Sequence, residues 1–161
     1  MCIIHIFYIS WYYIARMYDS IHQSLLEIVG FMNRPSQDEV LLQRAGVSLE
    51  QALFPLLIVI SHKKPIGIVE LAGYVNKDYS TVSRQVDKLV QRGLVATKRA
   101  EEDRRIRMLV TTPAGKAMIE KIRHARRQLM QEVLKNWSDE EIVQLEETLK
   151  HVVDSLETRS F

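Results

Sequence analysis

Apolar residues at helical spacing mark a short helix in the middle of the chain. They follow the pattern i, i+4, i+7 and i+8, and they are Val82, Val86, Leu89 and Val90. Asp78 is suited to cap the start of this helix, and Gly93 is the residue type best tolerated just past a helix end. The pattern therefore predicts a helix from Asp78 to Gly93 with one face turned to the core.

A β-hairpin and a second short helix are predicted on either side. Two runs rich in Val, Leu, Ile and Thr, Leu94–Arg99 and Ile106–Thr112, flank the charged linker 100–105, which favours a hairpin. Before the central helix, Ile66–Tyr74 has its own apolar face, and residues 75–77 form a turn. The inward positions of that helix are Ile68, Leu71, Ala72 and Val75. We expect the small residues Ala72 and Gly73 to allow close packing of two helices.

Residues 1–18 are strongly apolar and aromatic, and three interpretations compete. A membrane span needs about 20 apolar residues, whereas this run is shorter and is interrupted by His5, Ser10 and Arg16. A signal peptide needs a basic start and a small-residue cleavage site, and neither is present. We favour a β-branched and aromatic segment that packs on the rest of the protein or on a second subunit. An over-extended start that contributes little to function is the alternative for residues 1–16.

Helical periodicity begins at Asp19, where Asp19 or Ser20 is a candidate cap, and ends at Pro35. A short helix, 38–44, follows and stops at Gly46. Ser48 and Gln51 then have the spacing of a capping box for a buried helix over 49–61. Pro55 lies inside that pattern, so it either delays the start or kinks the helix.

The end of the chain predicts two long helices. Thr112 and Pro113 start the first, which runs to about Asn136 and has a basic outer face. Ser138 and Glu141 form a capping box for the second. The second carries a 3-4-3-4 seam of Ile142, Leu145, Leu149, Val152 and Leu156. Such surfaces on both helices and on the apolar start exceed what one subunit of this size covers, although packing within one chain is the alternative for the seam.

Charge is concentrated where the short helix and the hairpin lie. Residues 77–107 carry 9 Lys/Arg and 5 Asp/Glu, whereas the whole chain has a net charge of only +2 and residues 137–161 are acidic. The polar side of the short helix suits base edges and phosphates in a major groove. Its candidate DNA contacts are Ser80, Thr81, Ser83, Arg84, Gln85 and Lys88. Arg84 is suited to guanine, Gln85 to adenine and Lys88 to a phosphate, while Arg104 and Arg107 are placed to reach flanking phosphates.

Three motifs together resemble the winged helix-turn-helix of the multiple-antibiotic-resistance regulator (MarR) family. They are STVSRQVDKLVQRGLV, then DRR, then LVTTPAGKAM, within about residues 65–118. The resemblance implies a mainly α fold with a small β-wing and with N- and C-terminal dimerisation helices that intertwine across a two-fold axis. It also implies a homodimeric bacterial regulator of transcription, often released from DNA by a small molecule or by oxidation. In the family pattern the wing aspartate positions an arginine in the minor groove, which corresponds to Asp103 and Arg105.

The chain is expected to form one compact domain with three parts. These are N-terminal dimerisation helices in 1–48, the DNA-binding region in 49–112, and C-terminal dimerisation helices in 113–161. The predicted partners are double-stranded DNA, a second copy of the chain and a small aromatic or apolar effector, without a membrane. Two copies of the winged region predict a near-palindromic operator.

Other function classes find little support in the residues. The sequence holds no motif for nucleophilic catalysis or for a phosphate cradle, and its glycines are isolated. Its five histidines are scattered, so no enzyme activity, cofactor or metal is predicted. The single cysteine, Cys2, fits a reducing cytoplasm, and a redox-responsive regulator using Cys2 is one alternative. A winged-helix protein-interaction module without DNA binding is the other.

Overall fold

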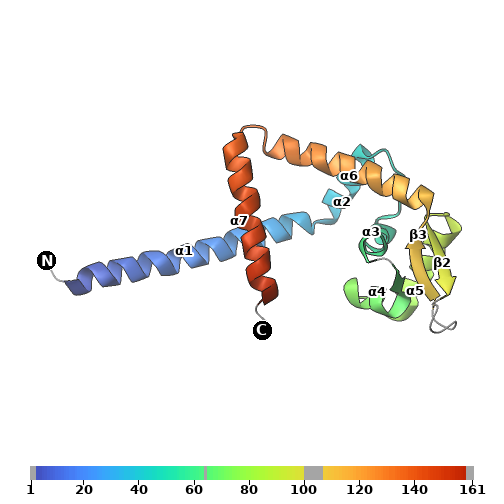
Figure 1. The fold of residues 1–161 in the computed structure, drawn as a ribbon, viewed down its shortest axis with the longest axis horizontal. Helices are drawn as coiled ribbons and strands as arrows, with labels where there is room; N and C mark the ends of the chain where they lie inside the picture. The colour runs from blue at the N-terminus through green and yellow to red at the C-terminus, as the bar shows by residue number, and fades with distance from the viewer. Residues whose placement is uncertain (1–2, 64, 100–106, 159–161) are drawn as a thin grey trace.

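The computed structural model describes residues 3–63, 65–99 and 107–158. Helices dominate, and a small sheet lies at one end of the molecule (Figure 1). In chain order the elements are α1 (Ile3–Met32), α2 (Pro35–Arg44), the 3-10 turn η1 (Gln51–Leu53), α3 (Phe54–His62), β1 (Ile66–Gly67), α4 (Ile68–Tyr74), α5 (Tyr79–Gln91), β2 (Val95–Arg99), β3 (Arg107–Thr111), α6 (Pro113–Val133) and α7 (Asp139–Thr158).

The sheet joins the start of the helix-turn-helix to the hairpin that follows it. Its strand order is β1-β3-β2, and both pairings are antiparallel. Ile66 pairs with Leu109, and Val95 pairs with Thr111 at the base of the hairpin. The predicted hairpin is therefore confirmed, and β1 fixes its base to the residues just before α4.

One hydrophobic core holds together residues 49–112, which are called the winged region below. Side chains from α3, α4, α5, β3 and the first half of α6 meet there, and α2 packs on α6. The residues without any exposed surface include Leu53, Leu56, Leu57, Ile60, Ile66, Leu71, Val82, Val86, Leu89 and Leu109. The apolar stripe predicted for α5 and the inward face predicted for α4 both lie in this core.

The first and last helices lie outside this core. In Figure 1 the N-terminal half of α1 extends away from the rest of the chain, and α7 lies far from the hairpin. No described residue of α1 or α7 is buried, and large apolar side chains on both helices are exposed. In a single chain the predicted seam of α7 is thus largely uncovered.

The structure corrects the prediction for the N-terminal segment. Instead of a helix that starts at Asp19 after a separate apolar segment, α1 is continuous from Ile3 to Met32. β-Branched and aromatic residues favour a strand only where they pack on a sheet, and the sheet lies at the opposite end of the molecule (Figure 1). Once the segment from Asp19 is helical, each further residue adds a hydrogen bond without a new nucleation step.

Four smaller predictions also change. Ser48 and Gln51 form no capping box, because the Gln51 amide donates to the Pro35 carbonyl. The turn η1 follows instead, and α3 starts later, with Pro55 in its first turn. Ile66 and Gly67 form β1 rather than the start of a helix. Gly73 is exposed and a Cβ there would meet nothing within 4 Å, so it does not serve close packing. Finally, α6 ends at Val133 rather than at about Asn136.

Within the described residues no helix is both long and apolar enough to cross a membrane.

Candidate nucleic-acid interface

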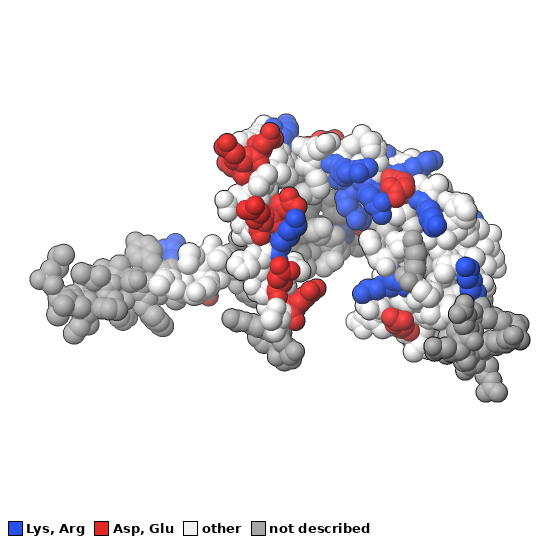
Figure 2. All heavy atoms as spheres, in the orientation of Figure 1, with Lys and Arg blue, Asp and Glu red and all other residues white. Residues whose placement is uncertain are grey.

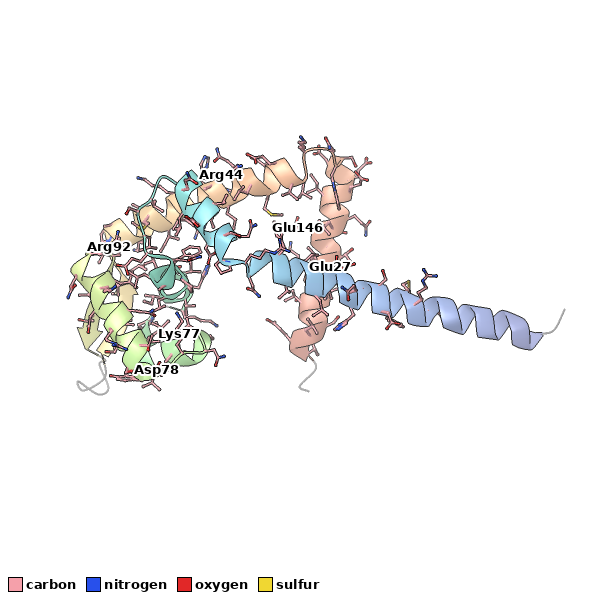
Figure 3. All side chains as sticks on the ribbon, turned by 180° about the vertical axis from the view of Figure 1, so that it is seen from behind. Glu27, Arg44, Lys77, Asp78, Arg92 and Glu146 are labelled. Atoms are coloured by element: carbon pink, nitrogen blue, oxygen red, sulfur yellow. The ribbon has the colours of Figure 1, made fainter. Side chains whose placement is uncertain are left out.

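Asp78 starts α5 as an N-cap, as the sequence predicts. Its carboxylate accepts the backbone N–H of Thr81 at 2.8 Å and the hydroxyl of Ser80 at 2.6 Å. These hydrogen bonds, first from Ser80 and then from Thr81, hold the pKa of Asp78 well below its usual range because they stabilise the charged form. The cap is exposed, at the end of the helix-turn-helix away from α6 (Figure 3). The first turn of α5 is thereby fixed at an exposed end of the molecule.

Gly93 ends α5 in the left-handed conformation, with φ of 68°. The Gly93 N–H donates to Val90 O at 2.9 Å, and the Leu94 N–H donates to Leu89 O at 3.0 Å. Thr112, the N-cap of α6, joins this end of α5 to the next helix. Its hydroxyl donates to Gly93 O at 2.6 Å and accepts the Gly115 N–H at 3.0 Å. The two ends of α5 are therefore both set by short polar contacts.

The outward face of α5 begins with Ser80 and Arg84. Both are exposed, and the Arg84 Nε donates to the Ser80 carbonyl at 3.3 Å, one helical turn earlier. This long contact leaves the Arg84 guanidinium with donors to spare. Thr81 and Ser83 are half-buried beside this face. The Ser80 hydroxyl already serves the Asp78 cap, so its lone pairs are the part that remains for a base or a water.

One edge of α5 faces the segment before α3. The Lys88 ammonium pairs with the Glu50 carboxylate at 2.7 Å, and the Arg92 guanidinium donates to the Ser48 carbonyl. Gln85 lies on the same edge, where its amide oxygen is buried and has no hydrogen-bond partner among the described residues. This placement differs from the open base-reading position expected for Gln85. The Lys88 pair likewise modifies the expected phosphate contact, because Lys88 would have to leave Glu50 to make it.

The wing is the hairpin of β2 and β3, and the structure describes only these two strands of it. Register pairs Arg99 with Arg107 at the last described step of the hairpin ladder. Asp103, Arg104 and Arg105 lie outside the described residues, as does the role proposed for Cys2. For Arg107 the structure describes the backbone and not the side chain. The wing contacts therefore stay predictions.

Two residues of this surface have no counterpart in the sequence interpretation. Glu50 and Arg92 contact their partners across 38 and 44 positions of the chain. For Arg92 a signal exists, because it follows Lys88 by four residues and Gln85 by seven, which is one edge of a helix. For Glu50 no local signal exists, since its partner is set by the tertiary fold.

Charge is distributed unevenly over the rest of the molecule. Acidic side chains gather on α7 and basic ones on α6 (Figure 2). The predicted basic face of α6 is exposed at Lys116, Lys121, Arg123, Arg126 and Arg127. Burial raises the pKa of Asp38 on α2, and the nearby Arg126 opposes that shift. Within the described part of the chain no group of three His, Cys, Asp or Glu side chains is placed to hold a metal ion.

A helix-turn-helix whose second helix has an open polar face, followed by a hairpin held to the first helix by β1, defines a winged helix-turn-helix protein. The MarR family model matches residues 49–106, which run from the segment before η1 through α3, β1, α4, α5 and β2 and end just before β3. The HTH-type transcriptional regulator BilQ of Clostridium symbiosum is 34% identical over 104 residues, which cover 65% of this chain and 71% of BilQ. The chain belongs to the MarR family.

Other relatives agree with this membership. The uncharacterized HTH-type transcriptional regulator YdgJ of Bacillus subtilis is 32% identical over 97 residues, and this match spans 60% of the chain and 59% of YdgJ. A MarR family protein from Bacillus stearothermophilus has the same fold, with a TM-score of 0.75 at 22% identity, covering 88% of this chain and 96% of that one. Wild-type apo MarR from E. coli gives a TM-score of 0.62 at 27% identity, covering 78% and 94%.

Proposed function

We propose that this protein is a homodimeric transcriptional regulator that binds a near-palindromic DNA operator. In each subunit α5 enters the major groove, and Arg84 reads a base edge near its first turns. Arg105 enters the adjacent minor groove from the wing, with Asp103 orienting it. The observation that carries this proposal is the division of α5: Val82, Val86 and Leu89 are completely buried, whereas Ser80 and Arg84 are exposed.

The dimer is supported by apolar surface that one chain leaves exposed. Ile21 and Ile28 on α1 retain about half of their accessible surface, as do Val153 and Leu156 on α7. Exposed apolar surface of this extent marks a contact with another protein surface. A two-fold axis then repeats α5, and half-sites about one helical turn of DNA apart, roughly 34 Å, follow from that symmetry.

Repression is the direction that we propose. A relative named a transcriptional repressor, IacR of Pseudomonas putida, is 25% identical over 112 residues. Release by a small aromatic or apolar effector is part of the same proposal. It acts only if the effector prefers one spacing of the two α5 helices over the other.

The test is binding to duplexes that the protein itself selects from a random pool. Each bidentate contact of Arg84 to guanine contributes about 1–3 kcal/mol of discrimination, so Arg84→Ala should weaken binding at both half-sites and relax the preference at one base pair. Arg105→Ala should weaken binding most on A-T-rich flanks, where the minor groove is narrow. Arg123→Ala is the matched control, because it removes the same charge from α6, where Arg123 pairs with Glu120.

Two results would contradict the proposal. If no duplex is enriched, or if Arg84→Ala and Arg105→Ala bind DNA as the control does, the fold serves protein contacts instead. If the purified protein is a monomer at the concentrations used, the two-site geometry fails.

A further inference from the structure

Lys88 lies on α5, and its charge is already paired. Its Nζ lies 2.7 Å from Glu50 Oε2, and the two side chains are 54% and 51% exposed. An exposed pair of this kind adds little to folding. The pair does, however, weaken the attraction of Lys88 for a phosphate, because a phosphate that approaches Lys88 is repelled by the carboxylate of Glu50.

The position of Glu50 is fixed by its neighbours rather than by the ion pair alone. Arg92 donates to the Ser48 carbonyl from the same edge of α5. Leu49 is buried in the core, and the Leu53 N–H donates to the Glu50 carbonyl at 2.9 Å. Gln51 is attached to the start of α2 through the Pro35 carbonyl. These contacts hold the backbone of residues 48–51 beside α5, so the carboxylate stays within reach of Lys88.

We propose that Glu50 holds Lys88 off the DNA backbone and thereby limits the sequence-independent part of binding. Phosphate contacts carry no sequence information, and they supply essentially all of non-specific affinity. A regulator that withholds one lysine per subunit loses affinity for every sequence and keeps the discrimination of Arg84. This inference rests on the proposed DNA-binding function and deepens it, since Glu50 acts as a positioning residue through Lys88.

The experiment measures binding of the full chain to a fixed non-operator duplex across a salt series by fluorescence anisotropy. Glu50→Gln removes the competing charge and keeps the shape of the side chain. We expect it to bind roughly three- to tenfold more tightly at low salt, with a steeper salt dependence. Each phosphate contact that the freed Lys88 gains should steepen the slope of log K against log salt by about 0.9, and a dimer should show about twice that change.

The matched control is Glu146→Gln. Glu146 also forms an exposed pair, with Lys150 at 2.6 Å, but on α7, far from the winged region (Figure 1). The variant has the same change in net charge, so it should leave the slope unchanged. Lys88→Met supplies the second arm: alone it should change non-operator binding little, and in the Glu50→Gln background it should abolish the gain.

Three outcomes would overturn the inference. The first is an equal slope for Glu50→Gln and Glu146→Gln. The second is a loss from Lys88→Met that is as large with Glu50 present as without it, because Lys88 would then already contact phosphate. The third is wild-type protein that binds no DNA at all, which overturns the proposed function too. Equal unfolding midpoints for all variants would show that a difference in slope does not come from misfolding.

Discussion

The carbonyl oxygen of Leu94 occupies the place where a side chain on Gly115 would begin. A Cβ built on Gly115 would lie 2.1 Å from that oxygen and 3.1 Å from the Leu94 carbonyl carbon. The same oxygen accepts the Thr112 N–H at 3.1 Å. The first turn of α6 therefore lies directly against the backbone that follows α5, and only glycine permits this distance.

Gly115→Ala should destabilise the fold. The Leu94 atoms that the new Cβ would meet belong to the backbone, so a side-chain rotation cannot relieve the strain. Overpacking of this kind costs about 1–3 kcal/mol. Chemical denaturation followed by circular dichroism would measure the loss. Gly73→Ala is the control, since a Cβ there meets nothing within 4 Å. In that helix alanine should be neutral or stabilising by up to about 1 kcal/mol. Equal stability of the two variants would show that α6 does not approach Leu94 this closely.

Gly93→Ala should destabilise the end of α5. The φ of 68° at Gly93 lies in the left-handed region, where a residue with a Cβ loses roughly 1–2 kcal/mol. Gly93→Asn should lose less, because asparagine tolerates this conformation. Thermal unfolding of both variants would test the order. If alanine is tolerated as well as asparagine, the helix ends in a different geometry.

Stability should depend on the charge of Asp78 in acid. Its pKa in the folded protein lies below the ordinary value of 3.8, because Ser80 and Thr81 donate hydrogen bonds to the carboxylate. The contribution of the charged cap is therefore complete above the unfolded-state pKa and declines as pH falls below about 3.8. Asp78→Asn should be less stable than wild type near neutral pH, and the difference should shrink as the pH is lowered through this range. Urea midpoints at a series of pH values would measure it, and a difference that is constant with pH would contradict the cap.

Leu149→Asp should dissociate the proposed dimer. Leu149 lies in the seam of α7, and 44% of its surface is exposed in a single chain. A carboxylate placed in an apolar interface loses its hydration without gaining a partner. Sedimentation velocity should show a monomer, with loss of operator binding. His151→Asp is the control, because it adds the same charge two residues further on, where the helix turns that side chain away from the seam. A dimer that survives Leu149→Asp would remove α7 from the interface.

Where the determinants are local, the sequence predicts the structure closely. Three signals for α5 lie within one stretch of chain. Asp78 marks its start, the stripe that includes Val82 and Val86 marks its buried face, and Gly93 marks its end. The capping box of Ser138 and Glu141 is confirmed for the same reason: the Ser138 N–H donates to Glu141 Oε2 at 2.7 Å, and the Glu141 N–H donates to Ser138 Oγ at 3.2 Å.

Where a structural feature depends on residues far apart in the chain, the sequence pattern does not predict it or predicts it wrongly. The same capping spacing at Ser48 and Gln51 fails because Gln51 finds the Pro35 carbonyl, 16 positions earlier. The pairing of Lys88 with Glu50 and the role of Gly115 depend on how α5, α6 and the preceding segment meet. The apolar residues before Asp19 have side chains typical of strands, yet α1 is helical from Ile3. The β-preference of these residues is weaker than the gain from extending a helix that already exists.

Thr112 has a mechanical consequence for the molecule. Through its hydroxyl and its N–H it is hydrogen-bonded to Gly93, Leu94 and Gly115, so the end of α5 and the start of α6 are joined through one residue, and we expect the two helices to tilt together. A helix of 21 residues is about 30 Å long, and a tilt of about 5° moves its far end by roughly 3 Å. In the proposed dimer we therefore expect a small rotation where the subunits meet to become a displacement of several ångströms at the two copies of α5, which would change their separation along a duplex.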